Sequence, residues 1–214
     1  MWPSRIDTQE LIAEAQAGSK EVIDELFTRH REALRRLVAL RLDPAIAARV
    51  DASDIVQETL IEANRRFSEY LRGDRMPFHL WLRRIALDRL IDAHRRHRVA
   101  ERRSVDRERP LHAAGAVDRS SVELSNLLRD PYLTPAAAAM KAELSVRFQE
   151  MLGFLSEPDR EILTMRHFEE LTNQEAAQAL DLSEPAAAMR YMRALRRLRA
   201  LLEGGSGEES EEDS

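Results

Sequence analysis

Residues 171–202 read LTNQEAAQALDLSEPAAAMRYMRALRRLRALL. Thr172 and Glu175 have the spacing of a capping box, in which each side chain accepts a hydrogen bond from the backbone N–H of the other residue. A tight turn follows, with Asp181 at a position that requires a left-handed conformation and Ser183 as the cap of the next helix. The stretch therefore predicts two helices joined by a tight turn, a helix-turn-helix.

The second of these helices has an apolar side and a cationic side. The residues whose spacing allows them to face a core are Ala187, Tyr191, Ala194, Leu198 and Leu202. The cations are Arg190, Arg193, Arg196, Arg197 and Arg199, with no acidic residue among them. A capped turn followed by so cationic a helix is typical of a helix-turn-helix that faces DNA phosphates. DNA is therefore the first expected partner, and an exposed, merely solvated helix face is the alternative.

Composition favours an all-α protein with two small units. The 214 residues are 33% charged, 43% hydrophobic and 5% aromatic, with seven glycines, which is typical of helices rather than sheets. The formal charge of −5 hides local basic patches. Residues 203–214 carry six acidic residues and no basic one, so residues 1–202 alone carry +1, which is −5 plus 6.

The chain contains no cysteine. This excludes disulfides, thiolate metal ligands and a cysteine nucleophile, and it fits a reducing compartment. No secretory pattern follows Met1, and the longest apolar runs are too short to cross a bilayer. We therefore expect a cytoplasmic protein without membrane insertion.

Helical periodicity also dominates the N-terminal half of the chain. Apolar residues recur at three and four positions from Thr8 to Leu42, with a break at Gly18 and Ser19, which predicts two helices. Another helix begins within residues 51–54, and its inward residues are Ile55, Val56, Thr59, Leu60, Ala63, Phe67 and Tyr70. Its outward face is mostly acidic and polar, and consists of Asp54, Gln57, Glu58, Ile61 and Glu62.

A further helix is predicted from Phe78 to about Arg98. Its expected inward residues are Trp81, Leu82, Ile85, Ala86, Leu90 and Ile91. Its expected outer residues are Arg83, Arg84, Arg89, Arg95, Arg96 and Arg98. Trp81 could serve as a stacking platform for a base, but its helical spacing with Leu82 and Ile85 favours a place in the core. This helix therefore carries a second cationic surface.

These segments resemble a known family, in the family's own order. The first block of matching sequence is DASDIVQETL at 51–60, PFHLWLRRIA at 77–86, DRLID at 88–92, and then Arg95 and Arg96. The second block is LSEPDREIL at 155–163, RHFE at 166–169 and the helix-turn-helix. Together they resemble regions 2 and 4 of the extracytoplasmic-function (ECF) sigma factors of bacterial RNA polymerase, over roughly three quarters of the chain.

The resemblance implies a two-domain transcription initiation factor. Its expected parts are a region 2 domain at 1–98, a flexible linker at 99–134, a region 4 domain at 135–202 and an acidic disordered tail at 203–214. Such a factor binds core RNA polymerase and recognises the minus-ten and minus-thirty-five promoter elements, without a cofactor. Members of the family are commonly held by an anti-sigma factor.

The resemblance also implies roles for individual residues. The set expected to bind core polymerase is Asp54, Gln57, Glu58, Ile61 and Glu62, where acidic groups suit a basic partner. The region 2 residues expected to bind DNA are Arg84, Arg89, Arg95 and Arg96. In region 4, Arg190 and Arg193 are expected to read bases, whereas Arg196 and Arg197 are expected to contact phosphates.

Two departures from the family pattern affect base readout. Asp88 stands where the family often has Asn, so a DNA-contacting amide is replaced by an anion that phosphate repels. The start of the recognition helix offers no side-chain hydrogen-bond donor, because it consists of Pro185, Ala186, Ala187, Ala188 and Met189. Recognition of the upstream element is therefore expected to depend on DNA shape.

Ser53 is a third departure, because many members carry Glu at this position. We interpret Ser53 as a helix-capping residue with no further role. The alternative is a regulatory phosphosite for a Ser/Thr kinase, at which phosphorylation restores the missing negative charge.

Three other interpretations remain open at this stage. The acidic tail could fold onto the arginines of its own domain instead of only solubilising the chain. Asp88, Asp92, His94 and His97 could form a metal cluster, but neighbouring arginines would repel a cation and no catalytic motif is present, so we expect no enzyme. A stand-alone helix-turn-helix regulator would leave residues 51–98 without a role.

Overall fold

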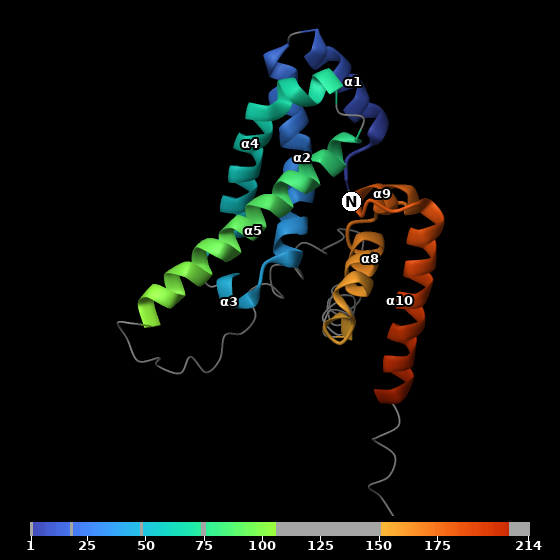
Figure 1. Cartoon of the computed structure of the whole chain (residues 1–214). Coiled ribbons are helices and arrows are strands. Elements are labelled where there is room, and N and C mark those ends of the chain that lie inside the picture. Colours follow the sequence, from blue (N-terminus) through green and yellow to red (C-terminus); the bar gives the residue numbers. More distant parts are fainter. Residues whose placement is uncertain (1, 18, 48, 74–75, 106–150, 206–214) are drawn as a thin grey trace, which may run out of the picture. The chain divides into compact units, whose positions relative to one another are not determined.

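The computed structural model describes residues 2–17, 19–47, 49–73, 76–105 and 151–205. Within these ranges the chain is helical and contains no strand, which confirms the predicted fold class. The chain divides into two compact units, Met1–Arg129 and Asp130–Ser214 (Figure 1). Most of the predicted linker and most of the predicted tail lie outside the described residues. No helix in the described ranges is long and apolar enough to cross a membrane.

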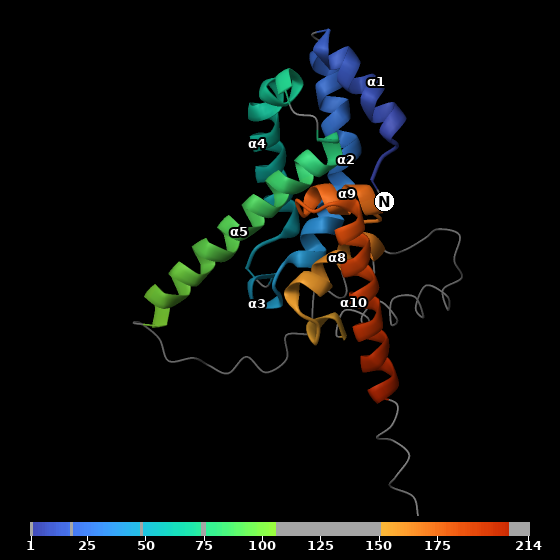
Figure 2. The ribbon, with the colours of Figure 1, turned by 45° about the vertical axis from the view of Figure 1, so that its right-hand side comes forward.

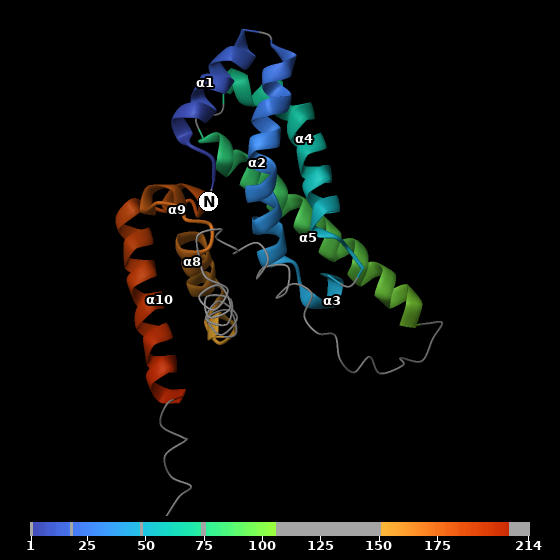
Figure 3. The same ribbon diagram turned by 180° about the vertical axis from the view of Figure 1, so that it is seen from behind.

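The first unit is built on a long helix that three others contact. In chain order its helices are α1 (Arg5–Gln16), α2 (Lys20–Arg41), α3 (Pro44–Ala47), α4 (Ala52–Gly73) and α5 (Phe78–Val105). Both α4 and α5 pack against α2 and against each other, while α1 packs on α2. Opposite views of the ribbon show this arrangement (Figures 1 and 3). The predicted break between the first two helices is confirmed.

An aromatic cluster fills the centre of the first unit. The rings of Tyr70 and Trp81 have centroids 4.8 Å apart, and those of Phe78 and Trp81 lie 5.5 Å apart. Phe27 and Phe67 meet edge to face at 5.6 Å. Trp81 is only 4% exposed, which confirms that it belongs to the core rather than to an open stacking surface.

Two predicted positions on α5 are wrong. Arg83 was expected outside but is buried, and Ile91 was expected inside but is 64% exposed. Residues 78–83 are all buried because the start of α5 is surrounded by packed helices, so no outer face exists there. Further along, α5 extends beyond its neighbours (Figure 1) and continues to Val105, past the predicted end near Arg98.

The described part of the second unit contains a short helical stretch at residues 151–153 and three complete helices. The complete helices are α8 (Glu157–His167), α9 (Asn173–Ala179) and α10 (Glu184–Gly205). Helix α10 packs on both α8 and α9, and Figure 2 shows the short α9 across one end of the pair. The buried apolar residues of this described part are Leu152, Leu155, Ile162, Leu163, Met165, Leu171, Ala176, Ala177, Ala187, Ala194 and Leu198. Helix α10 ends at Gly205, past the predicted boundary at residue 202.

His30 on α2 is a titratable group inside the first unit. It is 1% exposed, its Nδ1 donates a hydrogen bond to the Leu26 carbonyl at 2.8 Å, and its ring meets Phe78 edge to face at 5.0 Å. Burial lowers the pKa of His30 to about 4, and the hydrogen bond to Leu26 partly opposes this effect. Neighbouring His79 and Arg29 lower the pKa further. The folded unit therefore favours a neutral imidazole.

The first unit should lose stability as the pH falls. The unfolded chain binds a proton on His30 near pH 6.5 and the folded chain near pH 4, so the stabilisation is complete above the first value and is lost between them. His30 alone should remove about 2 kcal/mol between pH 7 and pH 5. Urea unfolding followed by the fluorescence of Trp2 and Trp81, both in this unit, measures the loss. A His30→Gln variant with an equally steep pH dependence would contradict the assignment.

Candidate polymerase and nucleic-acid interfaces

The outward face of α4 is polar, with one apolar residue within it. Asp54 and Gln57 are exposed, and Ile61 is 64% exposed, whereas the opposite face of the helix packs into the core. Glu62 is half-buried and accepts a hydrogen bond from Arg65 at 2.8 Å. This hydrogen bond lowers the pKa of Glu62, so its carboxylate stays ionised. The structure therefore places the predicted set on one accessible face.

One acid of this face is also bound to α5. Glu58 accepts hydrogen bonds from Nη2 of Arg96 at 2.9 and 3.2 Å, between residues that are 38 positions apart in the sequence. Both side chains are substantially exposed, at 42% and 60%. An exposed ion pair of this kind contributes about 1 kcal/mol or less. The expected polymerase face and the expected DNA face therefore share a contact.

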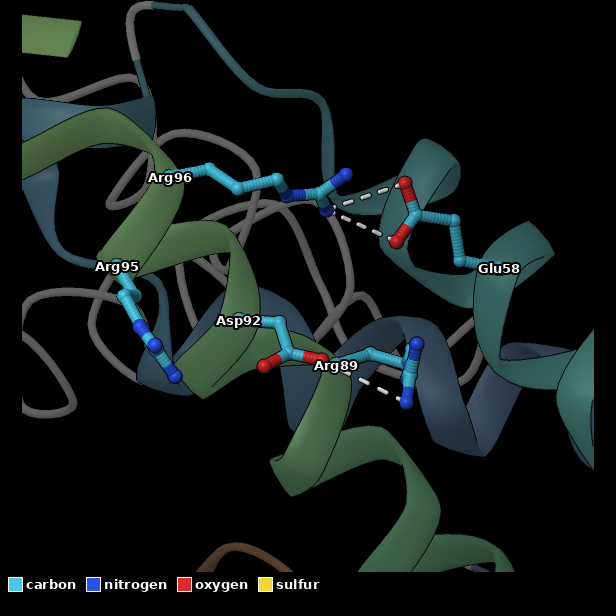
Figure 4. Close-up of a pocket in the computed structure, with 5 residues that line it drawn as sticks. All are labelled: Glu58, Arg89, Asp92, Arg95 and Arg96. Atoms are coloured by element: carbon cyan, nitrogen blue, oxygen red, sulfur yellow. Dashed lines mark hydrogen bonds and ion pairs between the residues drawn. The ribbon is translucent and has the colours of Figure 1, made fainter. Parts of the chain in front are cut away.

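A pocket of about 450 Å³ lies at this junction, lined by Glu58, Arg89, Asp92, Arg95 and Arg96 (Figure 4). Arg89 and Asp92 form an ion pair at 3.5 Å. The Nε of Arg89 is buried and has no hydrogen-bond partner among the described residues. Three guanidinium groups against two carboxylates leave the pocket with excess positive charge, which attracts phosphate.

The remaining predicted residues of α5 are placed differently. Arg84 is exposed but does not line the pocket, and Asp88 is exposed as well. Within the described ranges, no group of three or more acidic or histidine side chains is arranged to hold a metal ion. The three guanidinium groups that line the pocket favour anions over cations at this place on α5.

Ser53 does not cap α4 as predicted. Helix α4 begins at Ala52, so Ser53 lies inside the first turn. The Asp51 carboxylate accepts a hydrogen bond from the backbone N–H of Ser53 at 2.7 Å, and Asp51 therefore provides the cap. The Ser53 side chain is exposed, so its hydroxyl is accessible to solvent.

The turn between α9 and α10 follows the predicted geometry. Thr172 and Glu175 form the capping box, with both reciprocal hydrogen bonds present. Asp181 has φ 54°, the left-handed conformation that the turn requires. Ser183 Oγ accepts a hydrogen bond from the Ala186 N–H at 3.3 Å. These local interactions fix the direction in which α10 leaves the turn, and the helix-turn-helix is confirmed.

Helix α10 presents cations opposite its buried face. Ala187, Ala194 and Leu198 are buried, as predicted, while Arg193 and Arg196 are exposed. Arg190 is half-buried. Tyr191 is half-buried rather than fully in the core, and its hydroxyl lies 3.1 Å from Nε2 of His167. Leu202 is also predicted to face the core, but its side chain lies outside what the structure describes.

Arg197 has a structural contact that the sequence did not reveal. Its Nη1 donates to the carboxylate of Asp159, a residue of α8 that is 5% exposed. The guanidinium thus ties α10 to α8, and it is the partner of a buried carboxylate. The available signal in the sequence is the spacing of Asp159, which lies three and four positions before Ile162 and Leu163, the apolar residues that α8 buries.

Two stretches of the chain match known families in sequence. Residues 26–99 match the family described as Sigma-70 region 2, and residues 145–198 match Sigma-70, region 4. The first stretch contains α4 and most of α5, and the second contains α8, α9 and most of α10. The two matches therefore coincide with the two sets of surfaces described above.

Several curated relatives match over nearly the whole chain. RNA polymerase sigma factor CnrH of Cupriavidus metallidurans is 29% identical over 197 residues, which cover 92% of this chain and 94% of CnrH. RNA polymerase sigma-H factor of Pseudomonas aeruginosa is 28% identical, covering 87% and 89%. ECF RNA polymerase sigma factor SigD of Mycobacterium tuberculosis is 27% identical, covering 93% and 84%.

A solved structure shares the fold. The structure of CnrH in complex with the cytosolic domain of CnrY superposes with a TM-score of 0.56 at 24% identity. The likeness covers 94% of this chain and 97% of the other.

The ion pair between Arg197 and Asp159 should stabilise the second unit. An Arg197→Ala variant leaves the buried carboxylate without its partner, and the unit should lose about 1–2 kcal/mol of unfolding free energy. Arg196→Ala is the matched control, because Arg196 is exposed on the same helix, and its stability should change by less than about 0.5 kcal/mol.

Both tryptophans lie in the first unit, so amide hydrogen exchange in α8 and α10 is the suitable measurement for this ion pair. Equal protection in the two variants would show that the ion pair does not stabilise the unit.

Proposed function

Because the chain belongs to the sigma-70 family as an ECF sigma factor of RNA polymerase, we propose that α4 docks on core polymerase while α5 and α10 bind two promoter elements. The observation that carries this proposal is the presence of both family regions in order, each on helices with an exposed charged face. A stand-alone regulator would need only the helix-turn-helix and would leave α4 and α5 without a role.

The polymerase contact is assigned to the outward face of α4. Its members are Asp54, Gln57, Glu58, Ile61 and Glu62. Ile61 is 64% exposed among acids, and an apolar residue within a polar surface is the usual composition of a protein interface. Acidic neighbours favour a basic partner surface and speed the encounter.

The minus-ten contact is assigned to α5. Arg89, Arg95 and Arg96 share one pocket with excess positive charge, and Arg84 supplies an exposed cation on the same helix. Guanidinium groups hold the phosphates of a separated strand without regard to sequence. Asp88, which is exposed on this helix, would weaken phosphate binding at its own position.

The minus-thirty-five contact is assigned to α10. Arg193 and Arg196 are exposed, and Arg190 lies half-buried beside them. Arg197 is engaged with Asp159, so we assign it mainly to holding α10 in place, with any phosphate contact secondary. This changes the role expected from the sequence for that residue.

The domain boundaries and regulators belong to the same proposal. Because α5 continues to Val105 and α10 to Gly205, we extend the expected boundaries and assign region 2 to residues 1–105, a linker to 106–134, region 4 to 135–205 and an acidic tail to 206–214, in a protein that acts in the cytoplasm without catalysing a reaction. Since CnrH has been solved with the cytosolic domain of CnrY, an anti-sigma protein is a suitable regulator here. Phosphorylation of the exposed Ser53 by a Ser/Thr kinase is the alternative route.

Run-off transcription with core RNA polymerase and a pool of genomic promoter fragments tests this function. The full-length protein should produce transcripts that begin at shared sites, and core polymerase alone should not. Asp54→Arg is a better probe of docking than Glu58→Arg, because Glu58 is paired with Arg96 and its reversal would also disturb the DNA surface.

Asp54→Arg should weaken binding to core polymerase at least tenfold, since it places a cation against a basic partner. The matched control is Asp24→Arg, an equal charge reversal at an exposed position of α2. Binding to fluorescently labelled core polymerase measures both variants. Equal loss of binding in the two would show that net charge, and not the α4 face, determines docking.

A further inference from the structure

The start of α10 exposes apolar side chains where a helix-turn-helix normally reads bases. Pro185, Ala186 and Met189 are all exposed, and Met189 is 65% exposed. In this motif the N-terminal residues of the second helix contact base edges in the major groove. The apolar residues therefore occupy the positions with the most direct access to bases.

Met189 lies on the outward stripe of α10 and not at the edge of the core. It precedes Arg193 by four residues, so the two side chains neighbour each other on one helix face. Both are exposed, whereas Ala187, Ala194 and Leu198 on the other face are buried. Helix α10 packs on α8 and α9 with that buried face (Figure 2), and Met189 and Arg193 on the other side are exposed to solvent.

The charge around Met189 favours DNA over an apolar protein partner. Arg190 follows it directly, Arg193 lies one helical turn further on, Arg196 comes next, and no acidic residue occurs from 185 to 201. A narrow apolar spot bordered by cations suits the major groove, where base edges lie between two rows of phosphates. If an apolar protein surface covered Met189 instead, it would also cover the neighbouring guanidinium groups and remove them from water, which is unfavourable.

We propose that Met189 contacts the C5-methyl group of a thymine in the upstream promoter element, with Ala186 beside it. Among base edges in the major groove, only thymine offers an apolar group, and the flexible thioether chain of Met adapts to its position. This inference rests on the proposed binding of α10 to promoter DNA. It replaces readout by shape alone with a direct apolar contact.

Replacing thymine by deoxyuridine tests the contact, because it removes the methyl group and leaves every hydrogen-bonding group of the base unchanged. Each thymine of the upstream element, on either strand, is replaced singly in a promoter recovered from the transcription assay. Binding is measured with the holoenzyme containing the full-length protein at one fixed salt concentration. Loss of one buried methyl group should weaken binding about fourfold at one or two positions.

Met189→Ala should weaken binding to the thymine promoter by a similar factor. At the sensitive positions it should then show no further loss with deoxyuridine, because the methyl group has already lost its partner. The matched control is Leu201→Ala, which truncates another exposed apolar residue near the far end of the same helix. That variant should retain the full fourfold sensitivity.

Several results would overturn the inference. Binding that tolerates deoxyuridine at every position would assign specificity to DNA shape, whereas deoxyuridine losses that persist unchanged in Met189→Ala would assign the methyl contact to another residue. An upstream element without an A·T pair would overturn it equally. Unchanged DNA binding by Met189→Ala would indicate that this surface faces another partner.

Arg193→Ala separates failure of this inference from failure of the proposed function. If Arg193→Ala weakens holoenzyme binding across all promoters while deoxyuridine is tolerated, α10 binds DNA and only the methyl contact is wrong. If Arg193→Ala leaves binding unchanged, the assignment of α10 to promoter DNA fails as well.

Discussion

Burial of the apolar faces of α4 and α5 against α2 determines which side chains of the first unit are available for binding. The aromatic cluster of Phe67, Tyr70, Phe78 and Trp81 fixes the rotation of both helices about their own axes. With the apolar face of α4 turned into the core, its acidic stripe is left on the surface. The packing of α5 in turn places Arg96 beside this stripe. A substitution in this cluster would therefore alter both of the proposed binding surfaces, although it contacts neither.

In the described part of the second unit the buried apolar residues are aliphatic and sulfur-containing, without a buried aromatic ring. Local interactions around the turn also contribute to the orientation of α10. Two residues with positive φ, Glu170 at 56° and Asp181 at 54°, stand on either side of α9 and set the directions in which the chain enters and leaves it. Asn173 donates a hydrogen bond to the Glu184 carbonyl at 3.0 Å, which joins the two helices across the turn. The ion pair between Asp159 and Arg197 then holds the later part of α10 against α8.

Local features of the structure could be predicted from the sequence, and contacts between distant residues could not. The capping box at Thr172 and the left-handed Asp181 depend on neighbours within a few positions, so spacing alone identifies them. The buried face of α4 can be predicted because its apolar residues recur at the helical period. This period is regular because one side of the helix packs on the core and the other faces solvent. The period fails at the start of α5, where packing on all sides buries Arg83. Glu58–Arg96 and Asp159–Arg197 each join residues 38 positions apart, and only the packing of helices brings these pairs together. Of the four arginines of α10 expected to bind DNA, Arg197 is exposed but is also engaged with Asp159 within its own unit.

The Glu58–Arg96 pair has a consequence for the proposed function, because its two members belong to different binding surfaces. A basic polymerase surface on α4 would compete for Glu58, and a phosphate on α5 would compete for Arg96. Binding of either ligand breaks the ion pair between Glu58 and Arg96. The second ligand then binds without the free-energy cost of breaking it, so its affinity is higher. Because both side chains are substantially exposed, the coupling amounts to about 1 kcal/mol or less, equivalent to a severalfold change in affinity. Salt screens such a pair, so the coupling should fade at high ionic strength while the packed core that positions both helices remains intact. A small electrostatic term between α4 and α5 can thus link two binding events that the fold otherwise keeps on separate faces.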